Sequence, residues 1–267
     1  MAEEKDLMQA APVPRRVMPL IYVIDTSGSM EGNKIGAVND AIRNVMNEIG
    51  TISKQNADAK IKVGILQFDT EAKWMYDTGL ISAEEYQYKD LEAVGLTNFG
   101  EACKELNSKL SKSKGWMNEP TGMRAAAILL MSDGEPTSDY VHELDKLKGN
   151  PWFMSATKLA LAIGNPADKK MLLDFTGSAE AIMTVNNIDS LIRMIKTISI
   201  TASIVNSQSA SVGTTTTPEG EKVPESVEVE TINKIKDTID DDPTLDVHRG
   251  TDSSGKKDNW DWPEGWS

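Results

Sequence analysis

Short side chains that carry oxygen stand in three separate segments of this sequence. The first is Asp-Thr-Ser-Gly-Ser at 25–29, the second is Thr97 in Gly-Leu-Thr-Asn, and the third is Asp133 in Ser-Asp-Gly. The candidate site residues are Asp25, Ser27, Ser29, Thr97 and Asp133. Two carboxylates and three hydroxyls suit a hard divalent cation such as Mg²⁺, Mn²⁺ or Ca²⁺ and suit zinc or copper poorly. If these side chains converge, they would form a metal site.

Convergence depends on the elements that carry the three segments. Between residues 16 and 205, short apolar runs alternate with helical periodicity, which predicts βαβ units and a parallel sheet. Strands are expected over 17–24, 61–68, 124–131, 157–163 and 181–185, and helices over 35–52, 99–110, 140–148, 168–175 and 188–205. Residues 72–77 follow the second strand too closely for a crossover helix, so they predict an antiparallel edge strand. The expected fold class is α/β, with a mostly parallel sheet and one antiparallel edge strand.

In such a sheet the carboxyl ends of the strands, near the switch in strand order, form a binding crevice. The segments at 25–29 and 132–134 each follow a strand directly, so their oxygens can meet there. If neutral hydroxyls touch the ion while the carboxylates hold its waters, the ion keeps much of its positive charge. It would then attract one more anionic oxygen.

The sequence at 25–29 fits the DxSxS signature of von Willebrand factor A (VWA) domains, and Thr97 and Asp133 fall in the expected later loops. Residues 16–205 resemble that family. Ser-Asp-Gly-Glu-Pro-Thr at 132–137, Asn-Pro-Trp-Phe at 150–153 and Ala-Ile-Gly at 162–164 are most similar to its bacterial, tellurite-resistance-associated TerY-like branch.

The resemblance implies a Rossmann-like, doubly wound domain with a metal-ion-dependent adhesion site (MIDAS). Such a site binds Mg²⁺ or Mn²⁺ and captures an acidic side chain of a partner protein. Ser27 and Ser29 would bind the ion directly, Thr97 would do so in the ligand-competent state, and Asp25 and Asp133 would act mainly through water. Leu96 stands where the pattern has a second glycine, which bears on how freely the Thr97 loop moves. The branch implies a bacterial stress or tellurite-resistance complex with a protein kinase or a metal-dependent protein phosphatase.

Simpler interpretations exist for each motif alone. Asp25 to Ser29 and Thr97 could be helix N-caps, and Asp133-Gly134 could be a turn. A hydrolase or phosphotransferase using the same metal, and a metal-independent scaffold, are the competing functions. Neither His142 nor His248 lies in a nucleophile motif. We therefore expect a binding module and no enzyme.

The net charge of −13 over 267 residues is unevenly distributed. Residues 205–267 hold fourteen acidic and six basic residues, so they contribute −8 and the rest of the chain −5. Clustered Lys and Arg, which nucleic-acid binding requires, are scarce. The longest early apolar run is about eight residues, short of the roughly 20 that span a membrane. With an acidic start and one cysteine, Cys103, these features predict a cytoplasmic protein with neither nucleic-acid binding nor membrane insertion.

We divide the chain into an N-terminal extension (1–15), the VWA domain (16–205), an acidic flexible linker (206–242) and a tryptophan-containing tail (243–267). Ser, Thr, Glu, Gly and Pro dominate the first part of the linker. Trp260, Trp262 and Trp266 crowd the end of the tail, and Trp is enriched at interface hot spots. The tail is expected to dock on a partner; its alternatives are an internal inhibitor of the metal site and a merely solubilising extension.

Overall fold

The computed structural model describes residues 14–164, 169–208, 214–216, 222–224, 226–242, 245 and 247–249. The strands are β1 Arg16–Asp25, β2 Ala59–Phe68, β3 Ala72–Trp74, β4 Ile81–Ser82, β5 Ala127–Ser132, β6 Thr157–Ile163, β7 Ile182–Val185, β8 Thr214–Thr216, β9 Lys222–Pro224 and β10 Val247–Arg249. The α-helices are α1 Asn33–Gln55, α2 Phe99–Lys109, α3 Val141–Lys148, α4 Pro151–Met154, α5 Lys170–Thr176, α6 Ile188–Ser207 and α7 Val227–Asp241. Two short 3₁₀ helices cover Gly28–Met30 and Ala179–Ala181.

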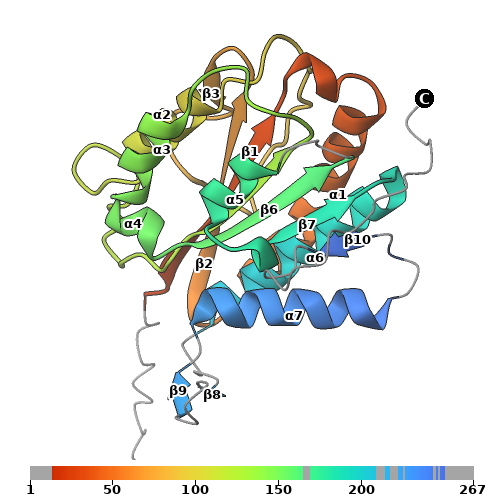
Figure 1. Cartoon of the computed structure of the whole chain (residues 1–267). Coiled ribbons are helices and arrows are strands. Elements are labelled where there is room, and N and C mark those ends of the chain that lie inside the picture. The colour runs from red at the N-terminus through yellow and green to blue at the C-terminus, as the bar shows by residue number, and fades with distance from the viewer. Residues whose placement is uncertain are drawn as a thin grey trace, which may run out of the picture.

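One sheet organises the domain, with the strand order β10-β7-β6-β5-β1-β2-β3 and with β4 also paired to β2 (Figure 1). The pairs from β7 through to β2 are parallel, whereas β3, β4 and β10 pair antiparallel with their neighbours. β8 and β9 form a separate two-stranded antiparallel sheet. The strand order reverses beside β1, so the chain leaves β1 and β5 toward a common crevice.

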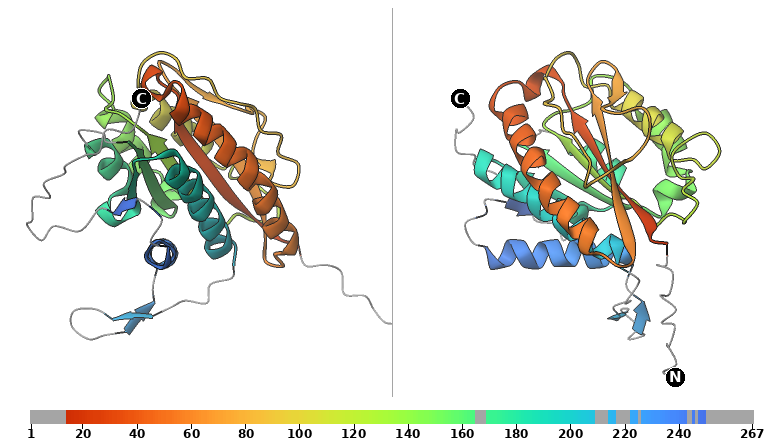
Figure 2. Two further views of the ribbon diagram at one scale, coloured as in Figure 1. Left: turned by 90° about the vertical axis from the view of Figure 1, so that its right-hand side faces the viewer. Right: turned by 180° about the vertical axis from the view of Figure 1, so that it is seen from behind.

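β1 is buried on both faces because helices cover both sides of the sheet. Alternate residues of β1 point to opposite faces of the sheet. Leu20 and Tyr22 pack in the core under α1 and α6, whereas Ile21 and Val23 pack in the core under α2 and α3. The two further views show α1 and α6 side by side on one face, with α7 next to α6 (Figure 2). A two-sided core of this kind fixes the direction and the end point of β1.

The expected α/β class and mostly parallel sheet are confirmed, and β3 is the expected antiparallel edge strand. The five parallel strands and five main helices fall within a few residues of their predicted positions. The sequence patterns missed β4, α4, β8, β9, α7 and β10. These elements are short, or they lie beyond the segment with clear alternation.

The flexible linker predicted over 206–242 is wrong for residues 227–241, which form α7. Ser226 caps the helix, because its side chain accepts a 3.2 Å hydrogen bond from the amide of Val229. Ile232, Ile235 and Ile239 are buried in the core that α1 and α6 share. The isoleucine spacing therefore produces an amphipathic helix inside the segment that was predicted to be a linker.

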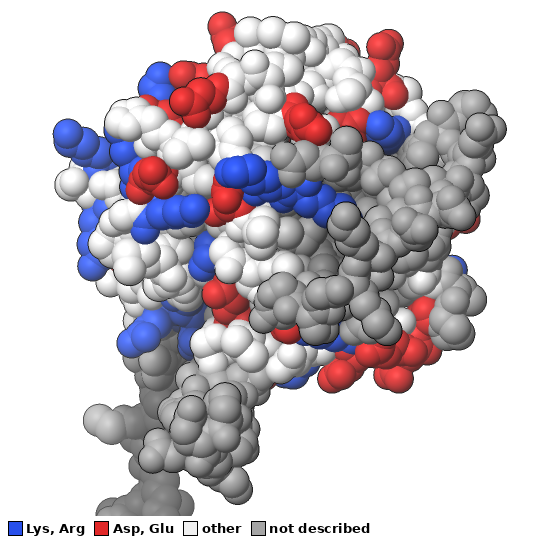
Figure 3. All heavy atoms as spheres, in the orientation of Figure 1, with Lys and Arg blue, Asp and Glu red and all other residues white. Residues whose placement is uncertain are grey.

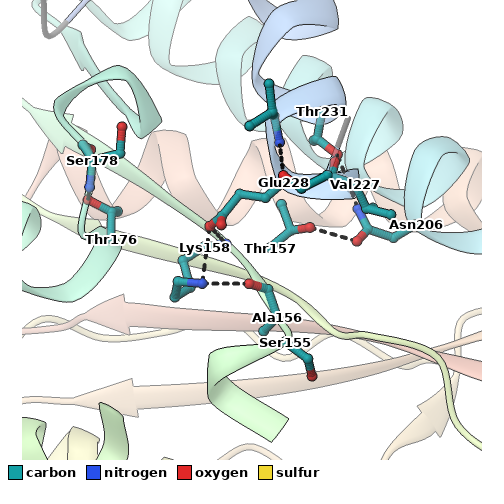
Figure 4. A network of polar contacts seen from close by, with 12 residues as sticks. Ser155, Ala156, Thr157, Lys158, Thr176, Ser178, Asn206, Val227, Glu228 and Thr231 are labelled. Atoms are coloured by element: carbon teal, nitrogen blue, oxygen red, sulfur yellow. Dashed lines mark hydrogen bonds and ion pairs between the residues drawn. The ribbon is translucent and has the colours of Figure 1, made fainter. Parts of the chain in front are cut away.

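Polar contacts fasten the start of α7 to β6 and α6 (Figure 4). Glu228 accepts hydrogen bonds from the amide of Lys158 at 3.0 Å and lies 3.1 Å from its ammonium. The side chain of Asn206 accepts a 2.8 Å bond from the Thr157 hydroxyl and donates to Thr231. These contacts bury polar groups with partners, so α7 is an integral part of the domain.

β10 pairs antiparallel with β7 and so extends the sheet on the edge opposite β3. This strand falls in the segment 243–267 that we assigned to the tail. Trp260, Trp262 and Trp266 lie outside the described residues, as do residues 1–13 of the N-terminal extension. Among the described residues, no helix combines the length and the apolar character that crossing a membrane requires.

Charged side chains of both signs share the face shown in Figure 3. Basic side chains gather at the left, over α2 to α4, and acidic ones gather beside the C-terminal end of α7. The ammonium groups of Lys109 and Lys112 lie 5.3 and 5.5 Å from the ring centroids of Trp116 and Trp152. These two lysines therefore cover aromatic surface as well as carrying charge.

Candidate metal centre

The candidate site lies at the carboxyl ends of β1 and β5, which are neighbouring parallel strands. Their register places Ile24 opposite Met131, so the residues that follow, Asp25 and Ser132, end the strands side by side. Asp133 comes next in the chain. The fold therefore brings together two segments that are more than 100 residues apart in sequence, as the strand pattern predicts.

Asp25 is completely buried and is held by two hydrogen bonds. Its Oδ1 accepts a 2.9 Å bond from the amide of Ser27, and its Oδ2 accepts a 2.6 Å bond from the hydroxyl of Ser132. Burial raises the pKa of this carboxyl to about 6, and the nearby Asp133 adds to the rise, although the two hydrogen bonds oppose it. An isolated buried carboxylate is costly, so the site favours a positive charge near Asp25.

Ser27, Ser29 and Asp133 form a chain of short contacts. The hydroxyl of Ser29 donates to Oδ1 of Asp133 at 2.7 Å, and the hydroxyl oxygens of Ser27 and Ser29 lie 3.0 Å apart. Because Ser29 gives its only hydroxyl proton to Asp133, Ser27 is the donor in the second contact. Three of the predicted ligands are thus within contact distance of one another.

Backbone hydrogen bonds hold the Thr97 loop between the other two loops. Gly95 accepts a 3.1 Å bond from the amide of Gly28, and the carbonyl of Thr97 accepts a 2.9 Å bond from the amide of Thr137. Gly95 has φ +75°, and a Cβ there would lie only 2.6 Å from the Thr70 hydroxyl, so this position requires glycine. Thr97 itself is buried, and backbone bonds of its loop connect it to the loops of Gly28 and Thr137.

Lys34 and Ser132 also contribute to the site, although the sequence motifs did not identify them as site residues. The ammonium of Lys34, in the first turn of α1, lies 2.5 Å from Oδ2 of Asp133 and donates to the carbonyl of Ser29 at 3.2 Å. Ser132 immediately precedes Asp133, and its position at the end of a buried strand was the only signal for a role. The only sequence signal for a role of Lys34 was its position five residues after Ser29.

The donor set fits a hard divalent cation. Within the described ranges, no group of three or more His, Cys, Asp or Glu side chains could hold a metal ion. A metal at this crevice must therefore use serine and threonine hydroxyls together with the two aspartates, which is a set of oxygens suited to a hard divalent cation such as Mg²⁺, Mn²⁺ or Ca²⁺. Ser27, Ser29 and Thr97 would hold the ion, and Asp25 and Asp133 would balance its charge.

Two other residues with reactive side chains lie away from this crevice. Cys103 is buried on α2, and burial raises the pKa of its thiol, so it is an inert packing residue. His142 is largely exposed on α3.

Comparisons with known proteins agree with this architecture. Residues 20–197 match the von Willebrand factor type A domain. The human inter-alpha-trypsin inhibitor heavy chain H4 is 29% identical over 135 residues, which are 48% of this chain and 14% of that protein. The chain thus spans only a small part of this relative.

Similar solved structures include a von Willebrand factor type A protein from Catenulispora acidiphila (TM-score 0.51, 16% identity, 69% of this chain and 42% of that one). Another is the pilus adhesin SpaC from Lactobacillus rhamnosus GG in its open conformation (TM-score 0.54, 15% identity, 75% of this chain and 33% of that one). A third is proximal thread matrix protein 1 from the mussel byssus with a zinc-occupied MIDAS motif (TM-score 0.50, 15% identity, 71% of this chain and 46% of that one). At these identities the likeness establishes the fold alone.

The match covers most of the domain, from β1 into α6, and includes all three loops of the crevice. The chain therefore belongs to the von Willebrand factor type A domain family.

Proposed function

We propose that this protein is a metal-dependent interaction module in which a divalent cation, held by Ser27, Ser29 and Thr97, binds an acidic side chain of a partner protein. Asp25 and Asp133 act on the ion mainly through water and balance part of its charge. When bound, the ion supplies a positive centre that accepts a carboxylate oxygen. The module binds and does not catalyse.

The observation that carries this proposal is the contact chain Ser27, Ser29, Asp133 beside the buried Asp25. Ser29 forms the open side of the crevice, because it is exposed, whereas Asp25 is inaccessible and Ser27 and Thr97 are buried. A cation on that side would be only partly neutralised by the protein, so it would keep its attraction for an external anion.

The surroundings of the crevice indicate what else the partner offers. Val94 and Leu96 flank Gly95 on the Thr97 loop, and they are 57% and 58% exposed. Exposed aliphatic side chains beside a charged site offer apolar surface that a bound partner can cover. We infer that the partner presents an apolar side chain next to its acidic residue.

Selection from a displayed peptide library tests the binding function. In Mg²⁺, the protein should enrich peptides that pair Asp or Glu with an apolar neighbour, and chelator should release them. Asp133→Ala should abolish this enrichment. Lys196→Met, on α6 and remote from the crevice, is a control that should behave like the wild type. Equal enrichment with and without metal would refute the proposal.

A more specific part of the proposal concerns the biological setting. We propose that the partner is a protein kinase or a metal-dependent protein phosphatase in a bacterial, cytoplasmic stress or tellurite-resistance complex. The support is the similarity of residues 132–137, 150–153 and 162–164 to the TerY-like branch. Purified candidates of these two enzyme classes should bind the wild type in Mg²⁺ and should not bind Asp133→Ala.

A metal-dependent hydrolase or phosphotransferase is the competing function. It requires an ionised carboxylate with access to substrate, whereas Asp25 is fully buried and its two oxygens already accept hydrogen bonds. Incubation of the pure protein with nucleotides and phosphoesters in Mg²⁺ separates the two classes. Turnover that disappears in Asp25→Ala would favour the enzyme.

A further inference from the structure

Lys34 occupies an unusual position for a cation. It lies in the first turn of α1, where the unpaired amides favour negative charge and disfavour an ammonium group. Its side chain is 23% exposed, whereas that of Asp133 is fully buried. The contact with Asp133 therefore offsets an unfavourable interaction with the helix terminus.

The two oxygens of Asp133 have different partners. Oδ1 accepts the hydrogen bond from Ser29, and Oδ2 contacts the ammonium of Lys34 at 2.5 Å. Lys34 also donates to the carbonyl of Ser29, so it bridges two of the three loops that form the crevice. A positive charge that belongs to the protein is thus placed on the carboxylate that a divalent cation would use.

The charge count shows two opposite consequences. Asp25 and Asp133 contribute −2 when both are ionised, and Lys34 reduces this to −1. A divalent ion then brings the site to +1, whereas it would bring the site to zero if Lys34 were neutral. Lys34 consequently repels the metal and increases the attraction of the loaded site for an anion.

We propose that Lys34 is a built-in counter-ion that weakens metal binding and strengthens capture of a carboxylate by the metal-loaded site. The second part rests on the proposed function, whereas the first part does not. Together they make the metal and the acidic partner bind cooperatively, because each reduces the electrostatic cost of the other.

Titration of the purified full-length protein with Mn²⁺, followed by calorimetry or by the spectrum of free Mn²⁺, tests the first part. Lys34→Gln keeps a hydrogen-bond donor without the charge, and Lys34→Met removes both. Each should bind Mn²⁺ roughly tenfold more tightly than the wild type, which corresponds to about 1.4 kcal/mol. Lys34→Arg should stay close to the wild type.

The matched control is Lys196→Met. Lys196 on α6 pairs with Glu48 of α1 at 2.6 Å, so this variant also removes one lysine that contacts α1. Glu48 lies fourteen residues beyond Lys34 on α1, which is about 20 Å along the helix. The Mn²⁺ affinity of the Lys196→Met protein should equal that of the wild type. Unchanged or weaker Mn²⁺ binding in both Lys34→Gln and Lys34→Met would overturn the role of Lys34.

Acetate is the probe for the second part. Bound to the Mn²⁺-loaded wild type, acetate should tighten Mn²⁺ binding, and this effect should be several-fold smaller in Lys34→Gln. If acetate has no effect on the wild type, capture of a carboxylate fails while the effect of Lys34 on Mn²⁺ binding stands. An equal acetate effect in wild type and Lys34→Gln would overturn the second part.

Discussion

Ser132 donates a 2.6 Å hydrogen bond from its hydroxyl to Oδ2 of Asp25 and so joins the ends of two neighbouring strands. Both residues are buried, at the ends of β5 and β1. The bond fixes the orientation of the carboxylate and stabilises its ionised form. Ser132 is therefore a positioning residue for the candidate metal centre.

Ser132→Ala should raise the pKa of Asp25 further and lower the affinity for Mn²⁺ near pH 6. At pH 8 the free energy of unfolding should fall by about 1–3 kcal/mol, because the buried carboxylate loses a donor. Mn²⁺ titrations at several pH values and denaturant unfolding measure the two effects. Ser203→Ala is the matched control, since the hydroxyl of Ser203 is buried without a hydrogen-bond partner in the described part of the chain. Equal effects of the two substitutions would contradict the role of Ser132.

The ionisation of Asp25 should make the metal-free protein less stable as the pH rises. The pKa of Asp25 is about 6 in the folded state, against the ordinary value of 3.8 for an aspartate in the unfolded chain, so the folded state holds the proton more tightly. The contribution of Asp25 to the free energy of unfolding, about 3 kcal/mol in total, is fully present below pH 4 and is lost as the pH rises through about 6. Asp25→Asn should therefore be more stable than the wild type at pH 7, and the difference should shrink toward pH 4.

Metal binding should show the opposite trend with pH. Protons compete with the cation for Asp25, so the Mn²⁺ affinity should fall as the pH drops through about 6. Calorimetry between pH 5 and pH 8 checks this dependence. A flat profile in the wild type would show that Asp25 is already ionised at pH 5.

Ile235→Ala should destabilise the domain by about 2–4 kcal/mol, because Ile235 is buried on α7 against the main core. Thermal or denaturant unfolding provides the measurement. Val229→Ala, on the same helix but 40% exposed, is the control and should change stability by less than about 0.5 kcal/mol. If residues 227–241 were a linker, both substitutions would be neutral.

Leu96→Ser should weaken peptide binding in Mg²⁺ several-fold and leave Mn²⁺ affinity unchanged. Leu96 is exposed, so its side chain contributes little to the fold, and removing its apolar surface affects only a docked partner. Peptides selected as described above and a parallel Mn²⁺ titration give the two values. A loss of metal affinity would instead show that Leu96 determines the geometry of the Thr97 loop.

Removal of residues 251–267 tests the tail, since this cut keeps β10 and its pairing with β7. If Trp260, Trp262 and Trp266 form a docking arm, the truncated protein should bind its partner more weakly in Mg²⁺. If the tail inhibits the metal site, truncation should strengthen binding, and an added tail peptide should reverse the gain only when metal is present. Unchanged affinity would leave the solubilising role.

Local patterns predicted much of the fold because each buried parallel strand is an unbroken apolar run and each main helix has an apolar stripe. The same patterns placed Asp25 and Asp133 at strand ends, so their proximity followed from topology. α7 was underestimated because the polar composition before it outweighed three well-spaced isoleucines. β10 is three residues long, and its pairing with β7 depends on contacts that local sequence does not encode.

The sequence by itself determined the parallel part of the sheet, its crevice and the oxygen donors, since these depend on periodicity and on residue type at strand ends. Only the tertiary structure decided how the charges in the crevice are arranged. Asp25 is buried under a hydrogen bond from Ser132, whereas Asp133 is paired with Lys34 from a different element. Both facts depend on distances between segments far apart in the chain, and the electrostatic energy of a carboxylate depends on those distances and on its burial.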